Sequence, residues 1–133
     1  MAATMRTVLI VDDQPQVREL LQVTLEASSN PLRILTAANG DQALALAQAE
    51  LPELMILDIQ MPKGQLDGLD VCRLLKADKA TRPIFIILLT VKGQRWDRQV
   101  GQAAGADDYM VKPFSPLELL NKVEAALGEG TVA

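Results

Sequence analysis

The sequence predicts a doubly wound α/β domain, in which a five-stranded parallel sheet lies between two layers of helices. Short apolar runs alternate with amphipathic segments of helical period along the 133 residues. The runs are continuous rather than alternating, which is typical of strands buried on both faces. Right-handed crossovers between parallel strands place helices on both faces of the sheet. One domain accounts for this length, with an ordered core over about residues 6–128 and short tails.

Five strands are expected where the apolar runs lie. The first run is Val8-Leu9-Ile10-Val11, with polar residues on both sides. Pro52 breaks the helix that precedes the third strand, and Pro83 opens the fourth. The expected strands cover residues 8–11, 32–37, 54–57, 84–89 and 108–112.

Five helices are expected to follow these strands, and local signals mark several of their ends. Pro15 lies in the first turn of the first helix, and Asn39 can cap the second. Gly105 is expected to terminate the fourth helix, whose apolar face is the weakest in the chain. The expected helices cover residues 15–27, 40–49, 67–78, 94–104 and 116–127.

The last helix has the clearest start. Ser115, Pro116 and Glu118 form the signature of a capping box with proline at the first helical position. Gly128 is expected to stop this helix. On the fourth helix, by contrast, the main inward candidates are small: Val100, Ala103 and Ala104.

Composition excludes several function classes. The net charge of −4 and the lack of a Lys/Arg cluster argue against direct nucleic-acid binding. With no histidine, a Ser-His-Asp site and a His-ligated zinc are excluded. The single cysteine, Cys72, excludes an internal disulfide and is expected to be a small apolar helical residue. The longest apolar run, residues 84–89, is too short to span a bilayer, so we expect a cytoplasmic protein without membrane attachment.

Five side chains are expected to meet at one edge of the sheet. Each lies at or just after the end of an apolar run: Asp12, Asp13, Asp58, Thr90 and Lys112. In an open parallel sheet, ligands bind outside the carboxyl ends of the strands. Three carboxylates together attract a hard cation such as Mg²⁺. A lysine and a threonine beside them suit a transferred phosphoryl group.

These motifs together resemble the receiver domain of two-component response regulators, over essentially the whole chain. Each motif alone is common, but all of them in this order, each at the expected strand end, are hard to explain in another way. The motifs are Asp12-Asp13, Asp58, Thr90, Gly105-Ala106-Asp107-Asp108-Tyr109 and Lys112-Pro113-Phe114. The resemblance implies a flavodoxin-like strand order 2-1-3-4-5, as in the chemotaxis receiver.

The resemblance also implies roles for single residues. Asp58 resembles the phospho-acceptor that takes a phosphoryl group from a histidine kinase or a phosphotransfer protein. Asp13 and Asp58, with Asp12 through water and the backbone carbonyl of Gln60, would hold Mg²⁺. The only implied chemistry is self-catalysed phosphoryl transfer and autodephosphorylation, without turnover of an external substrate.

A switch is implied on the far side of the acceptor. Thr90 and Lys112 would each contact a phosphoryl oxygen, and Tyr109 would follow Thr90 by changing its rotamer. The peptide bond before Pro113 is expected to be cis. The output surface would be the face of the fourth helix, last strand and last helix, on a monomer or a weak, phosphorylation-linked dimer. Expected surface residues are Arg95, Arg98, Gln99, Tyr109 and Lys122.

Two features depart from the family pattern. The loop between Pro62 and Asp67-Gly68 is two residues longer than the usual form, which leaves its shape beside the site open. Val91 stands where a small residue is usual, and its branched side chain is expected to slow dephosphorylation or narrow the choice of donors.

Other interpretations remain for these residues. Asp12 and Asp13 can be helix caps, and Asp107 and Asp108 are expected to be solvated loop charges. Trp96 can pack on the rim of the core or stand exposed in a partner surface, and packing is favoured. Two other functions compete: a pseudo-receiver that binds a partner constitutively, and an aspartate-dependent phosphohydrolase. The hydrolase is disfavoured because Gln60 stands where such enzymes place a second aspartate.

Overall fold

A computed structural model of the chain describes residues 5–28, 31–61, 64–91 and 95–128, without the side chains of residues 95–98. Within these residues five parallel strands form one sheet in the order β2-β1-β3-β4-β5. The strands are β1 (Arg6–Val11), β2 (Leu32–Ala37), β3 (Leu54–Asp58), β4 (Phe85–Val91) and β5 (Asp108–Lys112). The helices are α1 (Pro15–Glu26), α2 (Gly40–Glu50), α3 (Gly68–Ala77), α4 (Arg95–Ala103) and α5 (Pro116–Leu127). The predicted fold class and strand order are confirmed.

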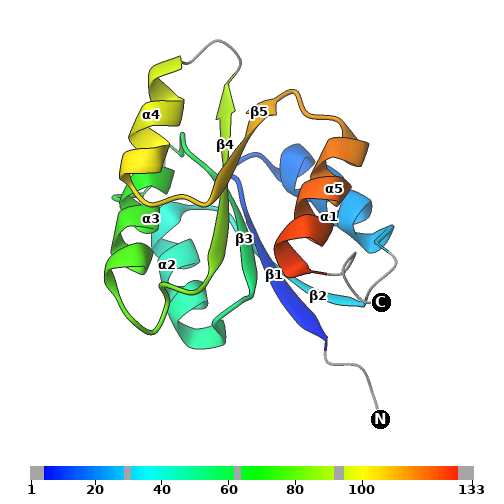
Figure 1. Cartoon of the computed structure of the whole chain (residues 1–133), viewed down its shortest axis with the longest axis horizontal. Helices are drawn as coiled ribbons and strands as arrows, with labels where there is room; N and C mark the ends of the chain where they lie inside the picture. The colour runs from blue at the N-terminus through cyan, green and yellow to red at the C-terminus, as the bar shows by residue number, and fades with distance from the viewer. Residues whose placement is uncertain (1–4, 29–30, 62–63, 92–94, 129–133) are drawn as a thin grey trace.

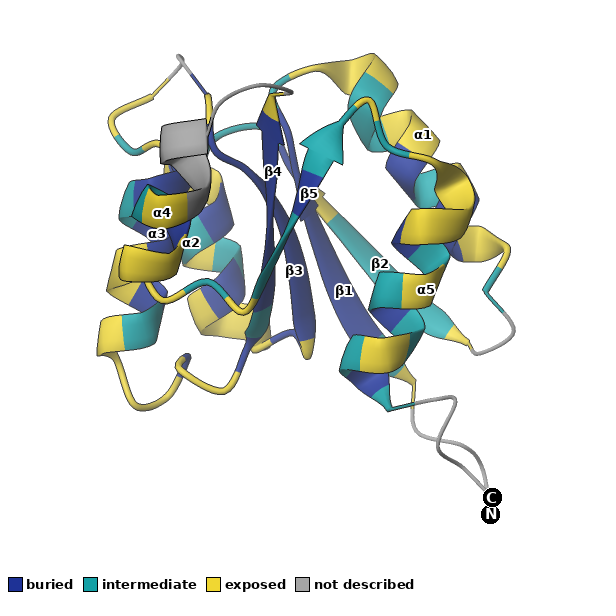
Figure 2. Cartoon of the chain, turned by 45° about the horizontal axis from the view of Figure 1, so that its top comes forward, coloured by how far each residue is buried: buried dark blue, intermediate teal, exposed yellow. Residues whose placement is uncertain are grey.

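Helices cover both faces of the sheet, so the core has two halves. In Figure 1, α1 and α5 lie on one face and α2, α3 and α4 on the other. Strands β1, β3 and β4 are almost entirely buried, whereas the edge strands β2 and β5 are partly exposed (Figure 2). This burial explains the continuous apolar runs, because central strands send alternate side chains into two cores.

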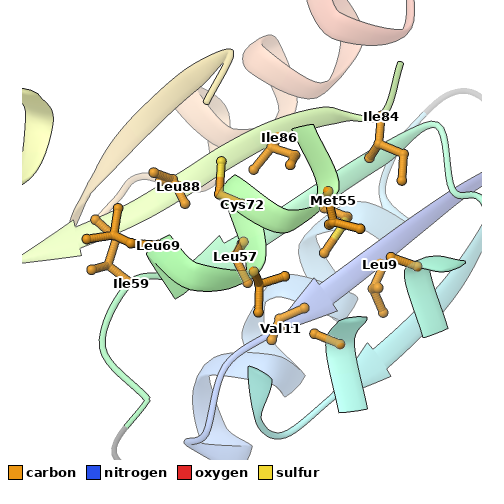
Figure 3. Packing of buried hydrophobic residues seen from close by; sticks show 14 of the residues in the cluster. Leu9, Val11, Met55, Leu57, Ile59, Leu69, Cys72, Ile84, Ile86 and Leu88 are labelled. Carbon is orange, nitrogen blue, oxygen red and sulfur yellow. The ribbon is translucent and has the colours of Figure 1, made fainter. Parts of the chain in front are cut away.

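Cys72 lies in the half of the core under α3. Figure 3 shows it among Leu57, Leu69, Ile86 and Leu88, and its side chain is fully buried. Burial raises the pKa of its thiol to about 11. A buried thiol with a raised pKa is mostly protonated and unreactive, so the prediction that Cys72 is a small apolar helical residue is confirmed.

Strand β4 runs further than its apolar residues indicated. It ends at Val91 rather than Leu89, because Thr90 pairs with Val111 and Val91 with Lys112 on β5. Thr90 is thus a buried residue inside a strand. Periodicity missed this extension, since a threonine after an apolar run is also typical of a strand end.

Helix caps were predicted with mixed success. Asn39 and Ser115 accept the amides of Gln42 and Glu118, as expected. The N-cap of α1 is Gln14, which makes no side-chain cap bond, so the cap interpretation is wrong for Asp13. Asp12 contributes instead, because its Oδ1 accepts the Gln14 amide at 2.9 Å.

Helix α4 approaches the sheet through small residues. Gly101 and Ala104 are buried and Val100 packs on the core, whereas Ala103 is exposed, contrary to the expectation. A Cβ atom at Gly101 would lie 2.8 Å from a methyl group of Leu88. The predictions for Arg95, Trp96 and Arg98 fall on side chains outside the described part.

The loop after α4 is tied to the end of α3 by one partly buried lysine. Lys76 Nζ donates to the carbonyls of Arg82 and Ile84 at 3.0 and 2.6 Å, and to Asp107 Oδ2 at 2.7 Å. Asp107 also accepts the amide of Ile86 at 2.9 Å. Asp107 is exposed, as expected, but its carboxylate also binds Lys76 and a backbone amide, which the solvated interpretation did not include. Asp108 departs from it too, because its carboxylate pairs with Lys122.

We expect Lys76→Met to lower the free energy of unfolding by about 2 kcal/mol, since two carbonyls and a carboxylate lose a charged donor. Urea unfolding measures this loss. Lys79→Met, at an exposed position in the turn that follows, is the matched control. Equal stability of the two variants would contradict a structural role for the Lys76 contacts.

No helix in the described ranges is both long and apolar enough to cross a bilayer.

Candidate phosphoryl-transfer site

The fold brings the five predicted side chains to the carboxyl edge of the sheet. Asp12 directly follows β1, Asp58 ends β3, Thr90 lies near the end of β4, and Lys112 ends β5. Asp12, Asp58 and Thr90 are buried, while Asp13 and Lys112 are partly exposed. This edge joins residues up to 100 positions apart in the chain.

Lys112 bridges two of the carboxylates. Its Nζ donates to Asp12 Oδ2 at 2.9 Å and to Asp58 Oδ2 at 3.2 Å. Burial acts to lower the pKa of Lys112, but the hydrogen bond to Asp12 and the charges of Asp58 and Asp12 outweigh it, so this pKa is raised. Lys112 is therefore a cation at physiological pH and is aimed at the predicted acceptor.

Three carboxylates converge beside this lysine. One oxygen each of Asp12, Asp13 and Asp58 lies within 4.8 Å of the other two. One ammonium cannot balance three negative charges, and hard oxygen donors are the ligands that Mg²⁺ and Ca²⁺ prefer. The residues present thus fit a divalent cation, as the sequence predicted.

Burial changes the acidity of the predicted acceptor. It raises the pKa of Asp58 to about 6, Lys112 opposes the shift, and the neighbouring charge of Asp12 adds to it. The amide of Gln60 donates to Asp58 Oδ1 at 3.2 Å, which places Gln60 next to the acceptor. Its carbonyl as a cation ligand stays a prediction.

Thr90 and Tyr109 share a cavity next to the site. The cavity has a volume of about 140 Å³ and is also lined by Ile59, Leu88 and Gly101. Tyr109 is partly buried and lies opposite Leu88 in the parallel register. The peptide bond between Lys112 and Pro113 is cis, as predicted.

The longer loop after β3 contacts the start of α2. The amide of Leu66 donates to Asp41 Oδ1 at 3.2 Å, and a Cβ atom at Gly40 would lie 2.2 Å from the Leu66 carbonyl oxygen. Pro62 and Lys63 in this loop lie outside the described residues. Val91 is 44% exposed and pairs in register with Lys112.

Sequence reasoning missed one residue at the site. Arg18, one turn into α1, donates from Nη1 to the backbone carbonyl of Asp12 at 2.6 Å. A basic residue one turn after an acidic pair is the only local signal, and it is as common on solvated helix faces.

Comparison with known proteins agrees with this geometry. A family description, "Response regulator receiver domain", matches residues 8–124. The chain belongs to the response regulator receiver domain family. It is accordingly a receiver domain of the two-component signalling type, with an acidic cluster able to hold a metal ion.

Transcriptional regulators are among the sequence relatives. The chain is 41% identical over 128 residues to the alkaline phosphatase synthesis transcriptional regulatory protein PhoP of Bacillus subtilis, which covers 96% of this chain and 51% of that protein. It is 41% identical over 122 residues to the phosphate regulon transcriptional regulatory protein PhoB of Pseudomonas aeruginosa, covering 92% of this chain and 52% of that one. This receiver domain thus spans about half the length of these relatives.

Solved structures support the same assignment. A putative response regulator from Chloroflexus aurantiacus superposes with a TM-score of 0.86 at 34% identity, covering 94% of this chain and 99% of that one. The chemotaxis response regulator CheY4 of Vibrio cholerae superposes with a TM-score of 0.82 at 32% identity, covering 92% and 99%.

Proposed function

We propose that this receiver domain accepts a phosphoryl group on Asp58 from a histidine kinase or a phosphotransfer protein, with Mg²⁺ as its cofactor. The observation that carries the proposal is the Lys112 ammonium, which bonds Asp12 and Asp58 beside three convergent carboxylates. A surface used only for binding a partner has no need for this concentration of buried charge.

The chemistry follows from charge. In the transfer an Asp58 carboxylate oxygen forms a bond to phosphorus while the P–N bond of a phosphohistidine breaks, and the imidazole nitrogen keeps the electron pair and takes up a proton. The acceptor and the phosphoryl group are both negative, so they repel one another. The cation would be held by Asp13, Asp58 and the Gln60 carbonyl, with Asp12 acting through water. When bound, it supplies positive charge that offsets the negative charge of the phosphoryl oxygens.

Lys112 supplies the other positive charge. Its bond to Asp12 keeps the ammonium beside Asp58, where it can pair with a phosphoryl oxygen while Thr90 donates to another. Autodephosphorylation would require water to reach the same phosphorus, and we propose that the branched side chain of Val91 at the end of β4 narrows that approach.

Intact-mass measurement with acetyl phosphate and Mg²⁺ tests the proposal. Wild type is expected to gain one phosphoryl group, and Asp58→Asn and EDTA-treated wild type none. Equal incorporation in wild type and Asp58→Asn would overturn the assignment of Asp58. No incorporation into wild type would favour a constitutive binding module.

Removal of Asp13 is expected to abolish or strongly reduce Mg²⁺ binding. Mg²⁺ retains several waters and is bound by few carboxylates, so each carboxylate contributes a large share of the affinity. Calorimetric titration of Asp13→Ala checks this, with Glu26→Ala, which removes an exposed carboxylate at the end of α1, as control. An unchanged affinity in Asp13→Ala would place the ion elsewhere.

Phosphorylation is proposed to act on the face of α4, β5 and α5 through Thr90 and Tyr109, which line one cavity. When Thr90 turns toward the phosphoryl group, the Tyr109 ring gains room to turn inward. A phosphoryl mimic is therefore expected to change hydrogen exchange on α4 and β5, and Tyr109→Ala to reduce that change. Changes confined to α2 and α3 would contradict this switch.

The wider context is proposed from the family. We propose a cytoplasmic location, one receiver domain over residues 1–133, a downstream protein partner on this face, and a monomer or weak dimer. Direct contact of this domain with nucleic acid is not expected, although its relatives are named as transcriptional regulators.

A further inference from the structure

Arg18 makes one contact that links helix α1 to the site. Its guanidinium reaches back along the helix to the turn after β1 and donates to the Asp12 carbonyl at 2.6 Å. We propose that Arg18 is a positioning residue for phosphoryl transfer, which holds the β1–α1 turn so that Asp12 keeps Lys112 directed at Asp58. This inference rests on the proposed function and adds a residue outside the family's set of site residues given above.

Asp12 is held from four directions, and Arg18 provides one of them. Its amide donates to the Ala37 carbonyl at 3.2 Å on the neighbouring strand. Its Oδ1 accepts the Gln14 amide and its Oδ2 accepts Lys112 Nζ, each at 2.9 Å. The carbonyl that Arg18 binds is therefore the remaining acceptor of this fully buried residue.

The start of α1 depends on this arrangement. Gln14 occupies the N-cap position without a side-chain cap bond. The amides of Val17 and Arg18 close the first helical turn on the Gln14 carbonyl, both at 3.1 Å. The Arg18 side chain, from the same helical turn, binds the Asp12 carbonyl. A charged hydrogen bond thus joins the start of α1 to the residue that follows β1.

Loss of this bond should affect both halves of the site. The turn that it spans also carries Asp13, the proposed cation ligand. A freed Asp12 carbonyl would let the turn move, and with it the partner of Lys112. Removal of a residue that holds a metal ligand in position commonly lowers metal affinity or activity by roughly ten- to a hundredfold. We therefore expect a loss of about tenfold in Mg²⁺ affinity.

Four proteins test the proposal: wild type, Arg18→Met, Arg18→Lys and Arg73→Met. Arg73 is an exposed arginine on α3 that pairs, among the described residues, with Asp70 one turn away, and it controls for the lost charge. Three quantities are measured: hydrogen exchange of the Gln14 amide without metal, affinity for Mg²⁺ alone, and phosphorylation rate against acetyl phosphate concentration. Thermal unfolding shows that each variant is folded.

Arg18→Met is expected to exchange the Gln14 amide faster, to bind Mg²⁺ about tenfold more weakly, and to have a lower maximal rate. The acetyl phosphate concentration for half-maximal rate at saturating Mg²⁺ should change little, because Arg18 is not proposed to touch the donor. Arg18→Lys should recover most of the loss, and Arg73→Met should match wild type. Equal behaviour of Arg18→Met and Arg73→Met would overturn the role of Arg18 but leave the proposed function intact. A wild type that neither binds Mg²⁺ nor gains a phosphoryl group would overturn the proposed function and this inference together.

Discussion

Asp58→Asn is expected to stabilise the metal-free domain while it abolishes phosphorylation. Burial raises the pKa of Asp58 from 3.8 to about 6. A carboxyl whose pKa is raised on folding costs stability once it is ionised, fully so above the folded pKa. At 1.36 kcal/mol per pKa unit this shift corresponds to about 3 kcal/mol at neutral pH. A buried amide also has a cost, so the net gain is expected to be about 1–3 kcal/mol.

The sign of this effect fixes its pH dependence. As the pH falls from about 6 towards 3.8, Asp58 takes up its proton and its cost in the folded wild type disappears. The stability gap between Asp58→Asn and wild type should therefore be large at pH 7.5 and small at pH 4.5. Urea unfolding of both proteins without divalent metal measures the gap at each pH.

A matched control separates this effect from a general change of charge. Glu19→Gln removes an exposed carboxylate on α1 and is expected to leave stability within about 0.5 kcal/mol. Added Mg²⁺ should stabilise wild type more than Asp58→Asn, since the cation offsets the buried negative charge that Asp58 carries and asparagine lacks. A gap that is absent at pH 7.5, or equal at both pH values, would contradict the cost assigned to Asp58.

Gly68→Ala is expected to destabilise the domain by about 2 kcal/mol or more and to impair the acceptor. A Cβ atom at Gly68 would lie 2.1 Å from the Asp58 carbonyl oxygen and 2.8 Å from the Ile59 Cα. Both neighbours are backbone, so α3 or the end of β3 must shift. The hydrogen bond that the Gly68 amide donates to the Ile59 carbonyl, 3.0 Å long, would be strained or lost.

Gly101→Ala is the matched control, because the near neighbour of its new Cβ among the described residues is a Leu88 methyl group, at 2.8 Å. A flexible side chain can move, and alanine favours a helix over glycine by about 1 kcal/mol, so the net effect should be small. Chemical unfolding and the rate of phosphorylation by acetyl phosphate measure both variants. If Gly68→Ala were as stable and as reactive as Gly101→Ala, the close approach of α3 to Asp58 would not matter.

Most of the fold could be predicted from local patterns. The apolar runs marked all five strands, and Asn39 and Ser115 were correctly placed as caps because capping depends on neighbours three residues away. Gly105 follows α4 with a φ of 95°, a conformation that glycine adopts readily. Local signals failed where a partner strand decided the outcome, as at Thr90 and Val91 on β4.

The candidate site was predictable for the residues at strand ends. Their convergence follows from parallel strands alone, because every carboxyl end lies at one edge. Arg18 and Lys76 were not predictable, since each binds backbone carbonyls that the sequence does not distinguish from any others. The contacts of the exposed Asp107 were not predicted for the same reason: its partners lie 21 and 31 residues away.

By itself, therefore, the sequence determined the helices and strands, their order along the chain and the residues that would meet at the carboxyl edge. These features depend on periodicity and on the polarity of strand ends. Only the tertiary structure decided which ammonium pairs with which carboxylate, how far β4 extends, and where Gly40 and Gly68 allow close backbone approach. The physical reason is that burial, charge pairing and steric contact depend on distances between segments, and those distances exist only once the sheet and its helices have packed.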